Sequence, residues 1–453
     1  NQLGGIGLMQ IPVLSGIYTD KAANFRTSYP LNLAPVPKKT GVSDGYLRPG
    51  DGIVKLGIGP GKDRGGIVWN DICYRVMGTK LVKIFADGTY RVLGDVGGSG
   101  QVTFDYSFDR LAIASSGFLY YYNGTTLTKV TDPDLGRVID FVWIDGYFMT
   151  TDGESLVVTE LNNPASVNPL KYGSSEADPD KIKALLKLRN EVYAVNRYTV
   201  EAFQNTGGDY FPFQRIEGAQ LMRGAVGTFA CAMFLESIVF VGSGRNEAPA
   251  VWIGSNGSTQ KLSTREIEQI LSKYSKAELE TILMEVRVFD GQQLLYVHLP
   301  DQSLVYDGIS SVIYNVPVWY RLTSGIVNNV KYRARNYLWC YNKWLCGDTE
   351  TNNHGYLTYD VSTHYGNPVG WEFGTLITYN EGRGGIFHNL ELICLTGRIK
   401  STNVSSEPSY LLQENRDFLL QEEYFRFVIE NNEQAQEYLS LIHISEPTRP
   451  ERI

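Results

Sequence analysis

Imidazole and thiol groups, the side chains best suited to binding a metal or attacking a substrate, are few in this sequence. Before residue 439 they are His298, His354, His364, His388, Cys73, Cys231, Cys340, Cys346 and Cys394. His354 and His364 are close enough in a Gly- and Asn-rich stretch to reach one metal ion, but no thiol or carboxylate spacing supports a zinc site. His298 lies in the apolar segment YVHLP, which favours a core position. The odd number and irregular spacing of the thiols favour reduced cysteines, so we expect no metal site.

Motifs that mark catalytic or nucleotide-binding sites are missing from the sequence as well. It contains no GxSxG elbow, P-loop, dinucleotide-binding fingerprint or HExxH helix. The segment from Gly57 to Gly66 is Gly-rich but lacks the Gly-Lys-Ser/Thr ending of a P-loop, which favours a surface loop. Asp87-Gly88-Thr89 and Asp152-Gly153 are similar to the turn motif of sialidase propellers, without its following Trp. We therefore expect a protein that is not an enzyme, with no catalytic residue and no cofactor.

The composition indicates which elements would have to position any site. Gly and Tyr are abundant, with 46 and 29 copies among 453 residues, while hydrophobic and charged residues make up an ordinary 43% and 20%. Aromatic residues fit pleated sheets and Gly fits tight turns, so we expect a mainly β chain with many short strands. The net charge of −8 and the lack of a Lys/Arg run argue against sequence-specific nucleic-acid binding. The lack of a long apolar stretch or a signal segment argues against membrane insertion and export.

From about Gly65 onward, apolar runs flank a turn at regular intervals. Equivalent positions in these units are Tyr74, Leu111, Tyr147, Val192, Ile238, Leu295 and Tyr337, which gives steps of 37, 36, 45, 46, 57 and 42 residues. Asn123-Gly124 and Asp152-Gly153 are expected to form turns between strands. Units of three or four strands every ~40–45 residues are typical of propeller blades. The pattern predicts a β-propeller-like body of six or seven blades.

The segment from Ser263 to Ile282 departs from the strand pattern and accounts for the longest step. Ser263 with Glu266, and Ser275 with Glu278, have the spacing of capping boxes. The residues that would share one helix face are Ile267, Ile270, Leu271 and Tyr274. We expect a helical insert packed on the flank of the propeller, and a helix that binds a partner is the alternative.

The sequence divides into five segments. Residues 1–8 precede Met9, behind a Gly4-Gly5 pair whose codons fit a ribosome-binding sequence, so we expect a non-native leader; a chain trimmed from a longer precursor is the alternative. Residues 9–45 are rich in Pro and Asn, which predicts an extended N-terminal arm that resists regular structure. Residues 46–365 form the expected propeller-like body with its insert at 263–282, and residues 366–438 form a smaller, truncated C-terminal β-rich domain. Residues 439–453 begin with LSLIHISEPTR, which resembles a translated sequencing adapter, and we expect an artefact there.

Four segments resemble, in the same order, the packaged-DNA stabilisation proteins of short-tailed enteric bacteriophages. They are SDGYLRPGDGI (Ser43–Ile53), YRVMGTKLVK (Tyr74–Lys83), LGDVGGSGQV (Leu93–Val102) and the longer segment Ser263–Asp307. The resemblance runs from Met9 to the mid-360s, and the region beyond matches only loosely. It implies a propeller-like fold and no catalytic residues.

The resemblance also implies a role and a set of partners. The family forms tail hubs, which are homohexamers that bind beneath the portal and its adaptor ring in the virion tail, after assembly in the bacterial cytoplasm. Such a hub closes the portal–adaptor channel, helps to retain the packaged DNA that passes through it, and supports tailspikes and a plug or needle.

Aromatic-rich runs are the candidate anchors for this kind of assembly. A head-to-tail ring closes through two different complementary patches on each subunit. Tyr120–Tyr122 and Trp339–Trp344 could supply such anchors, and the alternative is that they are ordinary strand residues inside blades. A glycan-binding or glycan-cleaving β-propeller is the other functional class left open, and it would need a carboxylate cluster at the propeller mouth.

Overall fold

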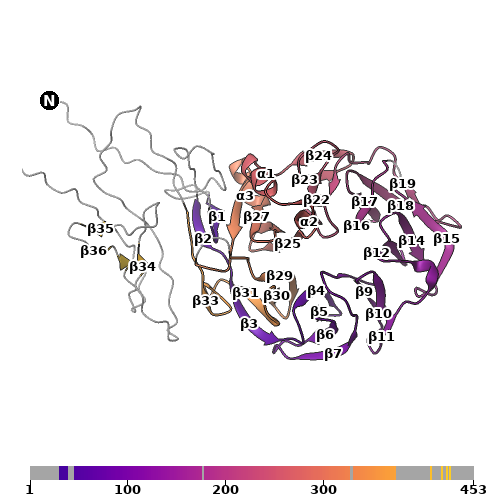
Figure 1. Cartoon of the computed structure of the whole chain (residues 1–453), viewed down its shortest axis with the longest axis horizontal. Helices are drawn as coiled ribbons and strands as arrows, with labels where there is room; N and C mark the ends of the chain where they lie inside the picture. Colours follow the sequence, from indigo (N-terminus) through magenta and orange to yellow (C-terminus); the bar gives the residue numbers. More distant parts are fainter. Residues whose placement is uncertain are drawn as a thin grey trace, which may run out of the picture. The chain divides into compact units, whose positions relative to one another are not determined.

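The computed structural model of the chain describes residues 30–38, 45–175, 178–326 and 330–373, together with four two-residue strands farther along. The chain divides into two compact units, with the division between Ile377 and Thr378. In the first unit, seven antiparallel sheets follow one another in a ring, so this unit is a seven-bladed β-propeller (Figure 1). The mainly β fold and the propeller predicted from the sequence are confirmed.

Blades 1 to 6 are each built from consecutive strands. Blade 1 is β4 (Asp63–Trp69), β5 (Ile72–Met77), β6 (Lys80–Ile84) and β7 (Tyr90–Asp95), and blade 2 is β8 (Thr103–Tyr106), β9 (Leu111–Ser115), β10 (Phe118–Tyr122) and β11 (Leu127–Lys129). Blade 3 is β12 (Asp140–Ile144), β13 (Tyr147–Thr151), β14 (Ser155–Thr159) and β15 (Val167–Ser174), and blade 4 is β16 (Ile182–Leu188), β17 (Glu191–Asn196), β18 (Val200–Asn205) and β19 (Phe213–Arg215). Blade 5 is β20 (Gly224–Ala225), β21 (Cys231–Phe234), β22 (Ser237–Ser243), β23 (Ala250–Ser255) and β24 (Ser258–Lys261), and blade 6 is β25 (Leu283–Phe289), β26 (Gln292–His298), β27 (Ser303–Asp307) and β28 (Trp319–Leu322).

Blade 7 combines strands from both ends of the propeller. The strands β29 (Ala334–Cys340), β30 (Lys343–Asp348) and β31 (Asn353–Thr358) pair in order, and β31 then pairs antiparallel with β3 (Gly52–Ile58) from the N-terminal side. Two short strands, β32 (Thr363–His364) and β33 (Asn367–Pro368), extend the same sheet beyond β3. Hydrogen bonds between residues some three hundred positions apart therefore close the ring.

The repeat found in the sequence corresponds to one defined strand of each blade. Tyr74, Leu111, Tyr147, Val192, Ile238 and Leu295 lie in β5, β9, β13, β17, β22 and β26, the second strands of blades 1 to 6. Tyr337 is the exception, because it lies in β29, the first strand of blade 7, so the equivalence at that position was wrong. The apolar run that contains Tyr337 precedes the first turn of its blade, whereas the matched runs of blades 1 to 6 follow that turn.

The hydrophobic core consists of seven separate layers, one between each pair of neighbouring blades. Each sheet therefore buries both of its faces, and many strands are apolar at every position rather than at alternate ones. In β10, Tyr120 and Tyr122 pack toward blade 1 while Tyr121 packs toward blade 3. All three rings are buried, so they are strand residues inside the blades and not exposed anchors.

Carboxylates connect the innermost strands of neighbouring blades. Asp105 in β8 accepts a hydrogen bond from the backbone N–H of Trp143 in β12 at 2.6 Å. Asp140 in β12 accepts one from the N–H of Leu185 in β16 at 2.8 Å. These strands diverge too far to pair along their length, so side chains satisfy backbone donors that would otherwise be buried without a partner.

Part of the predicted arm forms a regular hairpin. The strand β1 (Leu33–Pro37) pairs antiparallel with β2 (Gly45–Pro49), although Pro35 and Pro37 were expected to oppose regular structure. A two-stranded ribbon tolerates proline because each strand has a free edge. The rest of the arm, residues 9–29 and 39–44, lies outside the described residues.

The predicted helical insert is present as two short helices in the connection between blades 5 and 6. They are α1 (Arg265–Leu271) and α2 (Lys276–Leu279). Ile267 and Leu271 are fully buried in the layer between these blades, and Ile270 and Tyr274 pack at its edge, as the face pattern predicts. The capping box of Ser275 and Glu278 is confirmed.

The first predicted capping box is wrong. The helix α1 begins after Thr264, and Ser263 accepts a hydrogen bond from the N–H of Val251 in blade 5 instead of capping the helix. The sequence also gave no indication of α3 (Gly308–Tyr314), a helix of two turns between β27 and β28, or of the 3-10 turn η2 (Pro133–Leu135). Elements this short carry too few residues to show a period.

The second unit is described only in part. The strand β34 (Ser409–Tyr410) pairs with β37 (Val428–Ile429), and β35 (Leu420–Gln421) pairs with β36 (Phe425–Arg426). The expected leader, the expected adapter segment and most of the predicted domain 366–438 lie outside the described residues. Residues 366–373 belong to the first unit, since β33 extends the sheet of blade 7. Among the described residues, no helix is long and apolar enough to cross a bilayer.

Candidate assembly surfaces on the two faces of the propeller

The histidines singled out in the sequence are buried and lie apart. His298 is 1% exposed, and its Nδ1 lies 2.7 Å from the hydroxyl of Ser303. His354 in β31 and His364 in β32 flank opposite edges of β3, so the backbone of that strand separates them. Burial lowers the pKa of each of these two imidazoles to about 4. His388 lies outside the described residues.

In the described part of the chain, the cysteines and the Gly-rich and Asp-Gly turns noted in the sequence do not form a reactive cluster. Cys73, Cys231, Cys340 and Cys346 are free and buried, and no group of three or more potential metal ligands occurs there. The surface loop expected over Gly57–Gly66 is confined to residues 59–62, because the ends of this segment lie in β3 and β4. Asp87 lies in a third-to-fourth strand turn and Asp152 in a second-to-third strand turn, so the two motifs occupy different places in their blades.

The ring has two faces that differ in chemistry. The first strands of neighbouring blades contact one another around the centre of the ring (Figure 1). In every blade the first strand is the innermost and the later strands lie farther out, so all seven first strands run in the same direction. We call the face at which these strands begin the start face, and the face at which they end the end face. Turns between first and second strands, and between third and fourth strands, lie on the end face.

Large apolar side chains are exposed on the end face, in its turns, in α3 and near the ends of first strands. They are Phe85, Tyr106, Phe108, Leu161, Tyr210, Leu235, Val288, Val312, Ile313, Val316 and Trp339. Single exposed apolar residues are ordinary on any protein, but a set collected on one face indicates a surface that another protein covers. Val312, Ile313 and Val316 all come from α3 and the residues just after it, so this helix presents an apolar side outward.

Phe108 is the most exposed of these residues, at 93%. Its turn is held from within, since the Ser107 hydroxyl donates to Asp109 at 2.7 Å and Arg110 pairs with Asp109 at 2.6 Å. The Phe108 ring makes an edge-to-face contact with Trp143, at a centroid distance of 5.5 Å. A rigid turn that presents an aromatic ring to solvent has the properties of an interface anchor. Phe108 was not expected from the sequence, because the segment SFDR is typical of the end of a strand.

The second predicted anchor region, Trp339–Trp344, is only partly exposed. Trp339, near the end of β29, is 49% exposed on the end face, and its ring packs against the partly buried Trp344 at 5.4 Å. Tyr341 between them faces inward, and its hydroxyl donates to the carbonyl of Ile84 in blade 1 at 2.8 Å. Trp339 is therefore the exposed aromatic residue of this run.

One end-face turn carries backbone strain. Leu235 and Glu236, between β21 and β22, have φ angles of 51° and 53°, in the left-handed region that favours Asn and Gly. Leu235 is nevertheless an exposed apolar residue at 44%. Residues that break a local rule at a cost in stability are most often retained for function.

Replacing Glu236 by glycine is expected to raise the free energy of unfolding by about 0.5–1 kcal/mol, because glycine adopts this φ without a Cβ clash. The Glu236 side chain is 87% exposed, and its ion pair with Arg189, at 3.9 Å, is solvent-exposed. Its removal therefore costs little free energy of unfolding. Urea unfolding would measure the change. Glu236→Ala keeps the Cβ and should give no gain; an equal gain from both variants would show that the turn is not strained.

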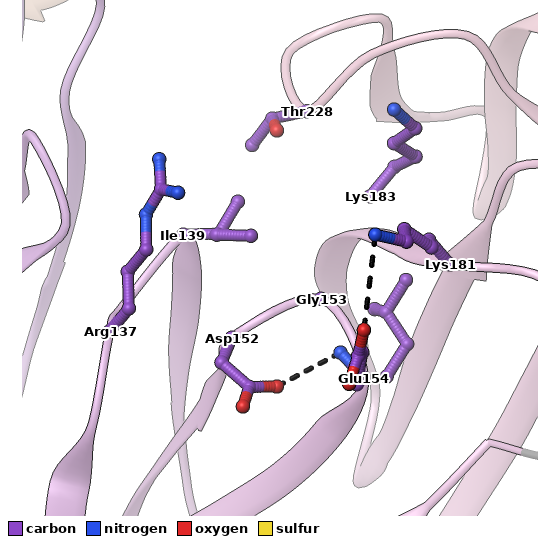
Figure 2. Close-up of a pocket in the computed structure, with 9 residues that line it drawn as sticks. Arg137, Ile139, Asp152, Gly153, Glu154, Lys181, Lys183 and Thr228 are labelled. Carbon is purple, nitrogen blue, oxygen red and sulfur yellow. Dashed lines mark hydrogen bonds and ion pairs between the residues drawn. The ribbon is translucent and has the colours of Figure 1, made fainter.

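The start face carries a small charged pocket. It is lined by Arg137, Ile139, Asp152, Gly153, Glu154, Lys181, Ile182, Lys183 and Thr228, and has a volume of about 220 Å³ (Figure 2). These residues precede or begin the first strands of blades 3, 4 and 5, or lie in a turn of blade 3. A pocket shared by three successive blades lies toward the centre of the ring. Its two carboxylates are engaged, since Asp152 accepts from the N–H of Glu154 at 2.9 Å and Glu154 lies 3.8 Å from Lys181.

The protein is a propeller with exposed apolar residues on one face and a small charged pocket on the other. The chain matches, over residues 9–362, the family model described as bacteriophage P22 Gp10, β-propeller. It is also 31% identical over 380 residues to the tail hub protein gp10 of Salmonella phage P22, which covers 79% of this chain and 78% of that protein. The chain therefore belongs to the P22 Gp10 family of phage β-propeller proteins, as the resemblance in the sequence predicts.

Solved structures of other propellers are only distantly similar. The WD40 domain of Neurospora crassa Pan2 covers 70% of this chain and 97% of its own, with 10% identity and a TM-score of 0.43. The N-terminal domain of Nup159 covers 72% of this chain and 98% of its own, with 8% identity and the same TM-score of 0.43. Similarity at this level carries no argument about function.

Proposed function

We propose that this protein is a structural component of a phage tail, the hub that binds beneath the portal and adaptor ring of a short-tailed phage. The observation that carries the proposal is membership of the Gp10 family, together with 31% identity to a relative named as a tail hub protein. The proposed location is the virion tail, reached after synthesis in the bacterial cytoplasm. The role is non-catalytic, and it needs surfaces and not an active site.

The finer role is that of a homohexamer that closes the portal–adaptor channel, retains the packaged DNA and supports tailspikes and a plug or needle. Two faces of different chemistry support this role, because a hub must contact different partners on different sides. The apolar end face, with Phe108 at 93% exposure, suits a permanent contact. The acidic balance of the chain, with a net charge of −8, suits a wall along which DNA passes without being gripped.

A complementation experiment tests this role in the particle. A phage whose copy of the gene is disrupted is expected to yield filled heads that lose their DNA, and the intact gene supplied in trans is expected to restore DNase-protected genomes. Phe108→Ser in the supplied gene should reduce the yield of DNA-retaining particles by roughly tenfold or more, as loss of a central aromatic anchor does.

Phe118→Ser is the matched control, because Phe118 is an exposed phenylalanine at 48% on the start face. It should support nearly the yield of the intact gene, and both variants should melt at the temperature of the unaltered protein. Stable, DNA-filled particles without the gene would contradict the proposed retention role. Equal yields from the two variants would show that the end face has no part in DNA retention.

A further inference from the structure

The pocket on the start face has the composition of a receptor for a negatively charged group. Arg137, Lys181 and Lys183 stand around its opening, with the Thr228 hydroxyl between them, as Figure 2 shows. Ile139, which is partly exposed, supplies an apolar floor, and Ile182 beside it is buried in the core layer between blades 3 and 4. A ligand that suits both parts has a short hydrocarbon chain ending in an anion.

The three cations are not equally available. Lys183 pairs with Glu280 at 3.4 Å, and Lys181 lies 3.8 Å from Glu154. Arg137 makes no hydrogen bond or ion pair with any residue that the structure describes. An anionic ligand would therefore supply the counter-ion of Arg137.

The Arg137 side chain is positioned despite this lack of a counter-ion. A Cβ at Gly117 would lie 3.1 Å from Cγ and 3.3 Å from Nε of Arg137, so the side chain lies against the backbone of the blade 2 turn. The N–H of Val138 donates to the carbonyl of Gly117 at 2.9 Å and fixes the two segments together. Arg137 is exposed, so its guanidinium is open to a ligand, and an arginine binds a carboxylate in a bidentate manner.

The pocket is kept open by Gly153. Its φ is 102°, and a Cβ there would lie 3.1 Å from Cδ1 of Ile139 in the floor. The volume of about 220 Å³ is below the ~300–1,000 Å³ of typical small-molecule sites. It matches a single side chain or chain terminus better than a cofactor.

We propose that this pocket binds a carboxylate carried by an acidic segment of a partner protein, with Arg137 as the principal contact. The Thr228 hydroxyl donates a second hydrogen bond, and Ile139 packs against the methylene groups that carry the carboxylate. Only the identity of the donor as another tail protein rests on the proposed function. The binding chemistry is independent of it.

Glutarate, two carboxylates on three methylene groups, is a suitable probe. Saturation-transfer NMR with the full chain at constant ionic strength is expected to show saturable binding, weakened roughly tenfold by Arg137→Gln through loss of a charge-assisted bidentate contact. Arg91→Gln removes an exposed arginine from the outer strand β7 and should leave binding unchanged. Thermal melting checks that both variants are folded.

Inorganic phosphate, followed by its phosphorus line width, distinguishes a general anion site from a carboxylate site. Glutarate binding that depends on Arg137 and exceeds phosphate binding supports the proposal. Phosphate binding tighter than glutarate binding, or glutarate binding that Arg137→Gln leaves unchanged, overturns it. A site that binds neither probe also overturns it but leaves the tail-hub proposal intact, because family membership does not depend on this pocket.

Discussion

Replacing Asp51 by asparagine is expected to lower the free energy of unfolding of the propeller by about 3–5 kcal/mol. Asp51 pairs with Arg287, whose side chain is 1% exposed, just before β3 closes the ring. Nε and Nη1 of Arg287 have no hydrogen-bond partner among the described atoms, and the guanidinium is surrounded by aromatic rings such as Trp344 at 5.7 Å. Without Asp51, a permanent charge would stay buried with no counter-ion. Urea unfolding followed by tryptophan fluorescence measures the loss.

The double variant Asp51→Asn with Arg287→Met is the control for this prediction. It removes both charges, keeps the apolar contacts of the long side chain, and is expected to recover most of the lost stability. If the double variant is as unstable as Asp51→Asn alone, the buried ion pair is not what holds the closing segment against blade 6.

Asp140 is expected to make the stability of the propeller fall as the pH rises toward 8. Burial raises the pKa of its carboxyl to about 7, and the hydrogen bonds from the Leu185 N–H and the Thr103 hydroxyl offset this only in part. The folded pKa lies above the unfolded value of about 3.9, so the folded state holds the extra proton. Its stabilising effect is complete below about pH 4 and is lost as the pH passes through 7, a change of up to about 4 kcal/mol.

Asp140→Asn removes this titration while keeping the hydrogen bonds, because the amide oxygen accepts from Leu185 and the amide nitrogen donates to Thr103. The free energy of unfolding of the variant, minus that of the unaltered protein, should increase from pH 5 to pH 8. Taking this difference cancels the contributions of the buried histidines. Asp134→Asn, at an exposed carboxylate, serves as the control, and a difference for Asp140→Asn that does not change with pH would contradict the account.

The blades could be predicted from the sequence because their strands are local. Six of the repeat positions, from Tyr74 to Leu295, lie in the second strand of blades 1 to 6, where a hairpin turn and an apolar run are adjacent in the chain. The closing strand β3 could not be found in this way. Its partner β31 lies at the other end of the propeller, and no local pattern records that pairing.

The contact surfaces were harder to predict than the fold. In the sequence, Tyr120–Tyr122 have the composition of an interface anchor. Both faces of a blade are buried, however, so all three tyrosines are internal. Phe108 follows a strand and is exposed only because its turn projects from the end face. The start-face pocket is assembled from three blades, and its residues, from Arg137 to Thr228, have no spacing that a motif could capture.

The central claim is that this chain is a hub bound to the portal and its adaptor ring. Native mass spectrometry of the full chain mixed with the portal–adaptor complex of its own phage tests this claim most directly. The account predicts a single larger species in which the complex has gained a closed ring of this chain, with six copies as the proposed number. A chain that remains free and monomeric beside an intact portal–adaptor complex would contradict it.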